Sequence, residues 1–240
     1  MLALSPQNPK VKLVRALLNS ASARKQHQLF VIENVNVISE IVKKTPNLIR
    51  YLIYSSPNSP FESIESHRIK TLSGLSSFKA PQDVLAVVRR PTWNVRPEKA
   101  VLVDRLANPA NFGAIIRNAA AFKMDAVYYT PGTVDPFHPE SVRAAAGSCV
   151  QIPILECNDF QTLGLTPYVM TPHSAQLLST TQFAKNPLFM FGSEAHGLDS
   201  SYSKYNSIKI DIAPEIESLN VAVSSGIVLY VFNNPCGGYN

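Results

Sequence analysis

The fold of this chain is decided by residues 207–232, S-I-K-I-D-I-A-P-E-I-E-S-L-N-V-A-V-S-S-G-I-V-L-Y-V-F. Residues 208–212 alternate apolar and polar side chains, which is the period of a half-buried strand. Pro214 ends that run, because proline cannot donate to a sheet ladder. We predict a helix over residues 221–232, although β-branched residues favour a strand there. The run is long for a strand, and small residues along it would let another backbone approach closely.

Polar side chains gather in the turn between this strand and this helix. Ser218 and Asn220 come just before the apolar run, where a helix N-cap is expected. We therefore predict that they converge with free backbone N–H groups on one place. For Asn220, capping alone is the simpler alternative to a functional role.

Charge is divided unequally along the 240 residues, of which 45% are hydrophobic and 16% charged. Residues 1–99 contain 15 lysines and arginines against 6 acidic residues, whereas residues 100–240 contain 7 against 11. This division indicates two domains with different partners, the first facing a polyanion such as nucleic acid. A merely basic surface is the alternative, because the chain has no long basic run.

Four classes of protein are not indicated by this sequence: disulfide-stabilised, metal-binding, membrane-spanning and secreted proteins. Cys149, Cys157 and Cys236 show no C-x-x-C spacing, so we expect neither a disulfide framework nor a metal site. No apolar run approaches the roughly 18 residues that span a bilayer, so we expect no membrane association. The first ten residues lack the apolar core of a signal peptide, which favours a cytoplasmic location.

The first part of the chain predicts a small α/β domain over residues 1–90. Apolar periodicity indicates helices at 10–18 and 35–44 and strands at 28–33, 48–54 and 83–89, with a Ser/Pro-rich loop at 55–66. Residues 91–99 contain two prolines and no apolar period, so we predict a linker there.

Residues 100–240 predict a second α/β domain built on a mostly parallel sheet with helices on both faces. Short runs that are apolar on both faces indicate strands at 101–103, 126–130, 152–155, 168–171 and 188–192, separated by helices that include 114–122 and 141–146. Ligands of such sheets bind beyond the carboxyl ends of the strands. The polar loops of this domain lie at those ends.

Two further loops carry polar and glycine residues after a predicted strand. One reads N-P-A-N-F-G at residues 108–113 and is followed by Arg117, and the other reads G-S-E-A-H-G-L at residues 192–198. Such glycines permit close approach of the backbone to a ligand. The fingerprints G-x-G-x-x-G, G-x-x-x-x-G-K-[ST] and H-E-x-x-H are all absent.

In order and spacing, the patterns N-P-A-N-F-G-x-x-x-R, F-G-S-E-A-H-G-L and I-D-I-x-x-x-I-E-S-L-N-V-A-V-S-S-G resemble the three signature motifs of the SpoU/TrmH branch of the SPOUT RNA methyltransferases. The resemblance covers residues 100–232. Upstream, N-P-x-V-K, L-F-V-I-E and P-Q-D-V-L-A-V-V resemble the ribosomal-protein-like domain with which many of these enzymes recruit substrate.

The resemblance implies an S-adenosylmethionine-dependent methyltransferase that acts on a ribose 2′-hydroxyl in structured RNA, with rRNA favoured over tRNA. It also implies a trefoil knot and a homodimer with active sites at its interface. Nothing in the periodicity indicates a knot, and general topology rules argue against one. The alternatives are an inactive RNA-binding protein of the same fold and, more remotely, a Rossmann-type oxidoreductase.

The resemblance also implies the site residues. The cofactor would lie against Thr171, Gly192, Gly197, Ile210, Ile212 and Leu219. The catalytic group would consist of Arg117, Asn111, Glu194, Ser218 and Asn220. A guanidinium stays protonated at neutral pH, so we expect Arg117 to hold a phosphate and stabilise the alkoxide, with Glu194 orienting it or acting as a base through water. Three residues depart from the commoner family pattern, namely Asn34, Asn108 and Ala145. These departures leave the identity of the RNA substrate open.

Overall fold

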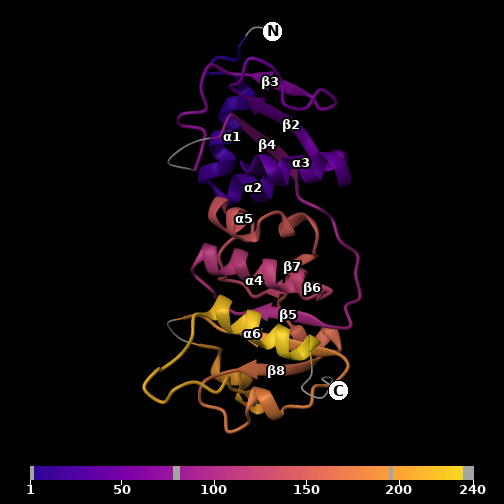
Figure 1. Ribbon diagram of the computed structural model, residues 1–240, viewed down its shortest axis with the longest axis vertical. Coiled ribbons are helices and arrows are strands. Elements are labelled where there is room, and N and C mark those ends of the chain that lie inside the picture. Colours follow the sequence, from indigo (N-terminus) through magenta and orange to yellow (C-terminus); the bar gives the residue numbers. More distant parts are fainter. Residues whose placement is uncertain (1–2, 78–81, 195–196, 235–240) are drawn as a thin grey trace. The chain divides into compact units, whose positions relative to one another are not determined.

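The computed structural model describes residues 3–77, 82–194 and 197–234, which form two compact units (Figure 1). The N-terminal unit comprises residues 1–92 together with 137–147, and the C-terminal unit comprises 93–136 and 148–240. Residues 137–147 lie in the region for which the sequence predicts the second domain, yet they pack with the N-terminal unit. Cys236 and His196 lie outside the described residues.

The N-terminal unit is built on a four-stranded sheet of order β1-β4-β2-β3. β4 (Val84–Arg89) runs antiparallel to both β1 (Leu29–Ile32) and β2 (Ile49–Tyr54), and β3 (Ser66–Arg68) runs parallel to β2. The strands predicted at 28–33, 48–54 and 83–89 are confirmed to within a residue or two. β3 was not predicted, because its residues follow a loop and alternate weakly.

Helices cover both faces of β1, whose four residues are all buried. On one face, α1 (Pro9–Asn19) buries Val11, Val14 and Leu17 in a core with the strands. On the other face, Phe30 meets Phe137 of the segment that leads into α5 (Pro139–Ala145), with 4.9 Å between ring centroids. The unit also contains α2 (Ala21–His27), α3 (Val35–Lys44) and a 3-10 turn, η1 (Pro46–Leu48).

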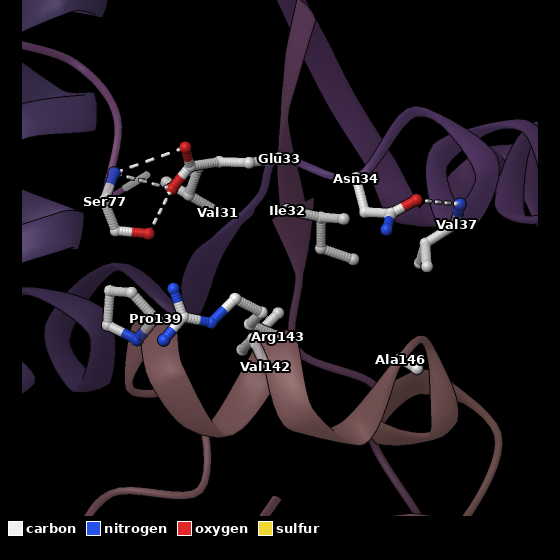
Figure 2. Close-up of a pocket in the computed structure, with 10 residues that line it drawn as sticks. All are labelled: Val31, Ile32, Glu33, Asn34, Val37, Ser77, Pro139, Val142, Arg143 and Ala146. Carbon is white, nitrogen blue, oxygen red and sulfur yellow. Dashed lines mark hydrogen bonds between the residues drawn. The ribbon is translucent and has the colours of Figure 1, made fainter. Parts of the chain in front are cut away.

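Two departures from the family pattern have local explanations in this unit, and Figure 2 shows the first of them, Asn34. Asn34 caps α3, because its Oδ1 accepts hydrogen bonds from the backbone N–H groups of Asn36 (3.0 Å) and Val37 (3.2 Å). Ala145 is fully buried in α5. Gly147 follows with φ +93°, and a Cβ there would lie 3.1 Å from Cγ1 of Val37.

The C-terminal unit contains a six-stranded sheet of order β10-β8-β9-β5-β6-β7, in which every neighbouring pair is parallel. The strands are β5 (Ala100–Val103), β6 (Ala126–Tyr129), β7 (Ile154–Glu156), β8 (Thr166–Met170), β9 (Pro187–Phe191) and β10 (Asn206–Ile208). The predicted parallel α/β architecture is therefore confirmed.

The two faces of this sheet are covered differently. Ala100, Leu102, Leu188 and Met190 point to a core closed by η3 (Phe160–Leu163) and η5 (Ser200–Lys204). Alternate residues point to the opposite face. There Phe189 meets Phe232 of α6 (Val221–Asn233) at 5.2 Å, and α6 packs against α4 (Pro109–Ala121). The short turns η2 (Ser148–Val150) and η4 (Leu178–Thr180) complete the unit.

The decisive stretch folds partly as predicted. The helix over 221–232 is confirmed as α6. The strand predicted at 208–212 is wrong in its bounds, because β10 ends at Ile208. Beyond it, Lys209 pairs with the loop before η4 instead of with β8: its N–H donates to Gln176 O (2.9 Å), and Leu178 N–H donates to its carbonyl (2.8 Å). The knot remains a prediction.

The helix predicted at 114–122 begins five residues earlier, at Pro109. The side chain of Asn108 accepts a hydrogen bond from Asn111 N–H (3.1 Å), and Pro109 occupies the first helical position, where its missing N–H costs nothing. Asn111 thus lies in the first turn of α4 and not in a loop.

No helix among residues 3–77, 82–194 and 197–234 is long and apolar enough to cross a bilayer.

Candidate active site

The three polar segments follow β5, β9 and β10 of the C-terminal sheet, of which β5 and β9 are neighbours and β10 is the edge strand beyond β8. Loop 104–108 follows β5, the glycine loop at 192–198 follows β9 beside it, and residues 209–220 follow β10 at the edge of the sheet. Because all these strands are parallel, their carboxyl ends lie at one edge of the sheet. The chain order also reverses between β5 and β9, which is where open α/β sheets bind their ligands.

A series of side-chain hydrogen bonds joins the first turn of α4 to the glycine loop and to the segment before α6. Asn220 Nδ2 donates to Asn111 Oδ1 (3.1 Å), and Asn111 Nδ2 donates to Oε1 of Glu194. These residues are up to 109 positions apart in the sequence. In both Asn220 and Asn111 the side-chain amide nitrogen is the donor, so the hydrogen bonds run in one direction toward the Glu194 carboxylate. The structure therefore brings together three of the five predicted catalytic residues.

The two asparagines also mark two helix N-termini. Asn220 Oδ1 accepts from the backbone N–H groups of Ala222 (2.9 Å) and Val223 (3.3 Å), so its oxygen caps α6 while its nitrogen reaches Asn111. Capping and a place in the site are thus compatible for this residue. Helix N-termini carry partial positive charge, so α4 and α6 together favour developing negative charge nearby.

The glycine loop after β9 is folded tightly back on itself. Ser193 N–H donates to Gly197 O (3.2 Å), and Gly197 N–H donates to Ser193 O (2.9 Å). A Cβ on Gly192 would overlap the backbone of Gly197 and Leu198. Gly197 needs glycine for a different reason, since its φ of +64° is left-handed. The loop thus presents backbone with no side chain at its first residue.

The other predicted cofactor residues lie on the segments after β8 and β10. Thr171, Ile210, Ile212 and Leu219 are all half-buried. Thr171 N–H donates to Ile208 O (3.1 Å), which joins the ends of the two strands. The main-chain groups of Ile210, Ile212 and Leu219 make no hydrogen bond to any described residue. These N–H and C=O groups are therefore available to form hydrogen bonds with a ligand.

Two predicted catalytic residues are not brought into this chain of bonds. Arg117 is exposed on α4, and its guanidinium makes no hydrogen bond or ion pair with a described residue. Ser218 is exposed in the irregular segment before α6. The pairing predicted between Glu194 and Arg117 is not formed here, since Glu194 accepts from Asn111 instead. Six positions after Asn111, Arg117 projects from another side of the helix.

Asn118 supports the site but was missed in the sequence. Its Nδ2 donates to the carbonyl of Ala222 (2.8 Å) and to Ser225 Oγ (2.9 Å), which ties α4 to the first turn of α6. A Cβ on Gly226 would lie 3.3 Å from the same nitrogen. The small residues of α6 therefore admit α4 of the same chain. The sequence spacing could have indicated this role, because Asn118 lies seven residues after Asn111 and therefore on the same face of the helix.

A second missed cluster connects the loops after β5 and β9. The buried carboxylate of Asp104 accepts from Arg105 Nε (3.1 Å) and Nη2 (2.9 Å) and from Thr130 Oγ1 (2.7 Å). Arg105 also lies 3.5 Å from Asp199, whose pKa is lowered by hydrogen bonds from Ser201 and then by this charge. The hydrogen bond and charge of Asp104 raise the pKa of Arg105. Arg105 thus links the segment after β5 to Asp199, which directly follows the glycine loop.

Comparison with known proteins places this geometry in context. Residues 98–230 match the profile of the SpoU rRNA Methylase family. An uncharacterized tRNA/rRNA methyltransferase of Synechocystis sp. is 29% identical over 94% of this chain and 91% of its own. The 23S rRNA (guanosine(2553)-2′-O)-methyltransferase of Bacillus subtilis is 25% identical over 94% of this chain and 96% of its own. An AdoMet-bound rRNA methyltransferase from Sinorhizobium meliloti superposes with a TM-score of 0.80, at 25% identity and 95% coverage of both chains.

Proposed function

Because this chain belongs to the SpoU rRNA methylase family, we propose that it transfers a methyl group from S-adenosylmethionine to a ribose 2′-hydroxyl of RNA, and of rRNA rather than tRNA. The observation that carries the proposal is the bonded chain Asn220–Asn111–Glu194 at the carboxyl edge of the sheet. The inactive alternative is not favoured, because Asn111, Arg117, Glu194 and Asn220 are all present. The proposed place of action is the cytoplasm.

The residues fit S-adenosylmethionine. Gly192 lets the backbone of Gly197 and Leu198 pack directly against it, which keeps the glycine loop closed, and the open main-chain groups of Ile210, Ile212 and Leu219 can bond to an adenine edge beside half-buried apolar side chains. When bound, the cofactor supplies an electrophilic methyl group on a sulfonium. No three His, Cys, Asp or Glu side chains among the described residues form a group that could hold a metal ion.

The protein must orient the ribose and stabilise the alkoxide that develops on its 2′-oxygen. We assign the holding of the neighbouring phosphate to Arg117, whose planar guanidinium can form two parallel bonds with it. Glu194 Oε1 is engaged by Asn111, which leaves Oε2 to accept the hydroxyl proton directly or through one water. Ser218 then lies on the segment that would position the hydroxyl.

We further propose a homodimer that forms through the outer face of α6. Val223 and Tyr230 are each 52% exposed and lie seven residues apart, on one side of an otherwise apolar helix. A symmetric interface there would bury both twice. Arg117, which has no described partner in its own chain, would then serve the partner's site.

The dimer proposal is tested by charging this face. Val223→Glu combined with Tyr230→Glu should convert the protein to monomers that methylate poorly, because four buried carboxylates would have to be desolvated. Sedimentation at micromolar concentration measures the change. Val95→Glu charges another exposed apolar position and should leave association unaltered. A wild-type protein that sediments as one species of 26.3 kDa would refute the dimer.

Asn220 offers a way to separate capping from positioning. Asn220→Asp keeps the oxygen that caps α6 but loses the donor to Asn111, so stability should change little while kcat falls about 10-fold or more. Asn220→Ala loses both and should also cost about 1 kcal/mol of stability. Thermal unfolding and single-turnover methylation give the two readouts. Wild-type kcat in Asn220→Asp would show that the bridge is not used.

The function itself is tested by mapping methylation. The purified protein, S-adenosylmethionine and ribosomal RNA from cells that lack this protein should yield one new 2′-O-methyl site, detected as resistance of one phosphodiester to alkaline hydrolysis. The same nucleotide should be unmodified in those cells and methylated in the parent strain. Absence of any new site in rRNA and tRNA would contradict the proposal.

A further inference from the structure

Exposed lysines and arginines of the N-terminal unit gather at one end of its sheet. β1 and β2 begin at this end and β4 finishes there, because β4 is antiparallel to both. α2 leads into β1, and α3 returns from the end of β1 to the start of β2, so the C-termini of both helices lie here too. We define the basic end by the exposed lysines and arginines that this topology gathers: Lys25, Lys43, Lys44, Arg50 and Arg89.

These cations are scarcely neutralised. On the elements that form the basic end, Glu40 is the one acidic side chain among the described residues, and it pairs with Lys44 at 2.7 Å. The hydrogen bond and charge of Lys44 lower the pKa of Glu40. Lys25, Lys43, Arg50 and Arg89 form no ion pair with a described residue.

The opposite end of the same sheet is different. There Glu33, at the end of β1, accepts hydrogen bonds from Ser77 N–H (3.0 Å) and Ser77 Oγ (2.7 Å) (Figure 2). Glu65 pairs with Lys10 and lies 2.8 Å from His67. Asp83 accepts from Ser55 (3.0 Å). Three acidic side chains therefore lie toward that end, whereas Glu40 is the acidic side chain at the basic end.

Helix stabilisation explains only part of the basic end. Lys25, Lys43 and Lys44 lie in the last turns of α2 and α3, where positive charge is favourable by a fraction of a kcal/mol. Arg50 and Arg89 lie on strands and gain nothing from a helix dipole. Arg50 lies at the irregularity where the pairing of β2 with β4 shifts, and Arg89 ends β4 beside Leu29. Their placement next to the helix cations needs another cause.

We propose that the basic end is the surface on which this unit holds the phosphate backbone of the RNA substrate. The inference rests on the proposed function and locates substrate recruitment at one end of one sheet. The affinity of such contacts depends on salt concentration, because each neutralised phosphate releases counterions and contributes roughly 0.7–0.9 to the slope of log affinity against log salt concentration. They carry no sequence information, so they recruit RNA and leave the choice of nucleotide to the C-terminal unit.

The test compares two triple variants of the full chain with equal loss of charge. The basic-end triple is Lys25→Gln, Arg50→Gln and Arg89→Gln. The control triple removes three exposed cations elsewhere in the same unit: Lys12→Gln, Arg15→Gln and Lys70→Gln. Thermal unfolding checks that both fold. Binding to protein-free ribosomal RNA is measured at several salt concentrations.

The basic-end triple should bind about 10²-fold more weakly at 0.1 M salt, with a slope smaller by about 2, whereas the control triple should shift less than about threefold. Equal losses in both triples would show that only net charge matters, and unchanged binding in both would show that this surface is not used; either overturns the inference. Methylation by the wild-type enzyme separates the two proposals. If the wild-type enzyme methylates RNA but both triple variants bind RNA equally well, the inference alone fails. If the wild-type enzyme does not methylate RNA but the basic-end triple alone loses RNA affinity, the proposed function alone fails.

Discussion

Replacing Arg117 by alanine should reduce turnover by about 10²-fold or more while leaving S-adenosylmethionine binding nearly intact. The guanidinium is exposed and makes no bond to a described residue, and alanine is the better helix former, so the variant should fold as well as the wild type. Its loss is therefore a loss of transition-state stabilisation, for which removal of one donor costs factors of this size. Single-turnover methylation and calorimetric titration with the cofactor measure the two quantities.

Two further variants sharpen this result. Arg117→Lys keeps the charge but loses the two parallel bonds, so it should recover only part of the rate. Arg15→Ala removes another exposed helix arginine, on α1, and should retain the wild-type rate. Unchanged methylation by folded Arg117→Ala would remove Arg117 from the mechanism.

Replacing Gly192 by alanine should weaken cofactor binding by about 10²-fold or more. The added Cβ would overlap backbone atoms of Gly197 and Leu198, which are not flexible side-chain ends. The glycine loop would have to open, and its bonds between Ser193 and Gly197 would break. Because well-packed structure yields only at a cost, the loop and its approach to the cofactor should both be lost.

Gly164 provides the matched control for this variant. It has φ +67° and nothing within 4 Å of a Cβ, so Gly164→Ala carries backbone strain without a clash and lies outside the proposed site. It should lose about 1 kcal/mol of stability and keep its cofactor affinity. Wild-type affinity in Gly192→Ala would show that the loop does not hold S-adenosylmethionine.

Local pattern was sufficient for much of the fold. Continuous apolar runs predicted five of the strands in the parallel sheet, because a strand buried on both faces needs apolar side chains throughout. The helix at the C-terminus was predicted against its β-branched composition from its length and small residues, and α6 confirms it. The motifs of residues 108–117, 192–198 and 210–226 predicted the family and the polar residues of the site.

Other features could not be read locally. The start of α4 at Pro109 depends on one cap from Asn108, and the end of β10 at Ile208 depends on where Lys209 finds a partner. In both places the local sequence is compatible with more than one element boundary, and the tertiary contacts decide which boundary forms. Residues 137–147 joined the N-terminal unit for the same kind of reason, because Phe137 and α5 bury their apolar side chains against β1.

The sequence by itself determined which residues this protein has for its chemistry, since motif order and residue type are properties of the chain. Only the tertiary structure decided which of them meet. Asn220 and Asn111 are bonded because Asn118 ties α4 to α6, whereas Arg117, one position before Asn118, is turned away from Glu194. The physical reason is distance along the chain: residue patterns report neighbours within a few turns, and a hydrogen bond across 109 residues exists only when packed helices hold both ends in place.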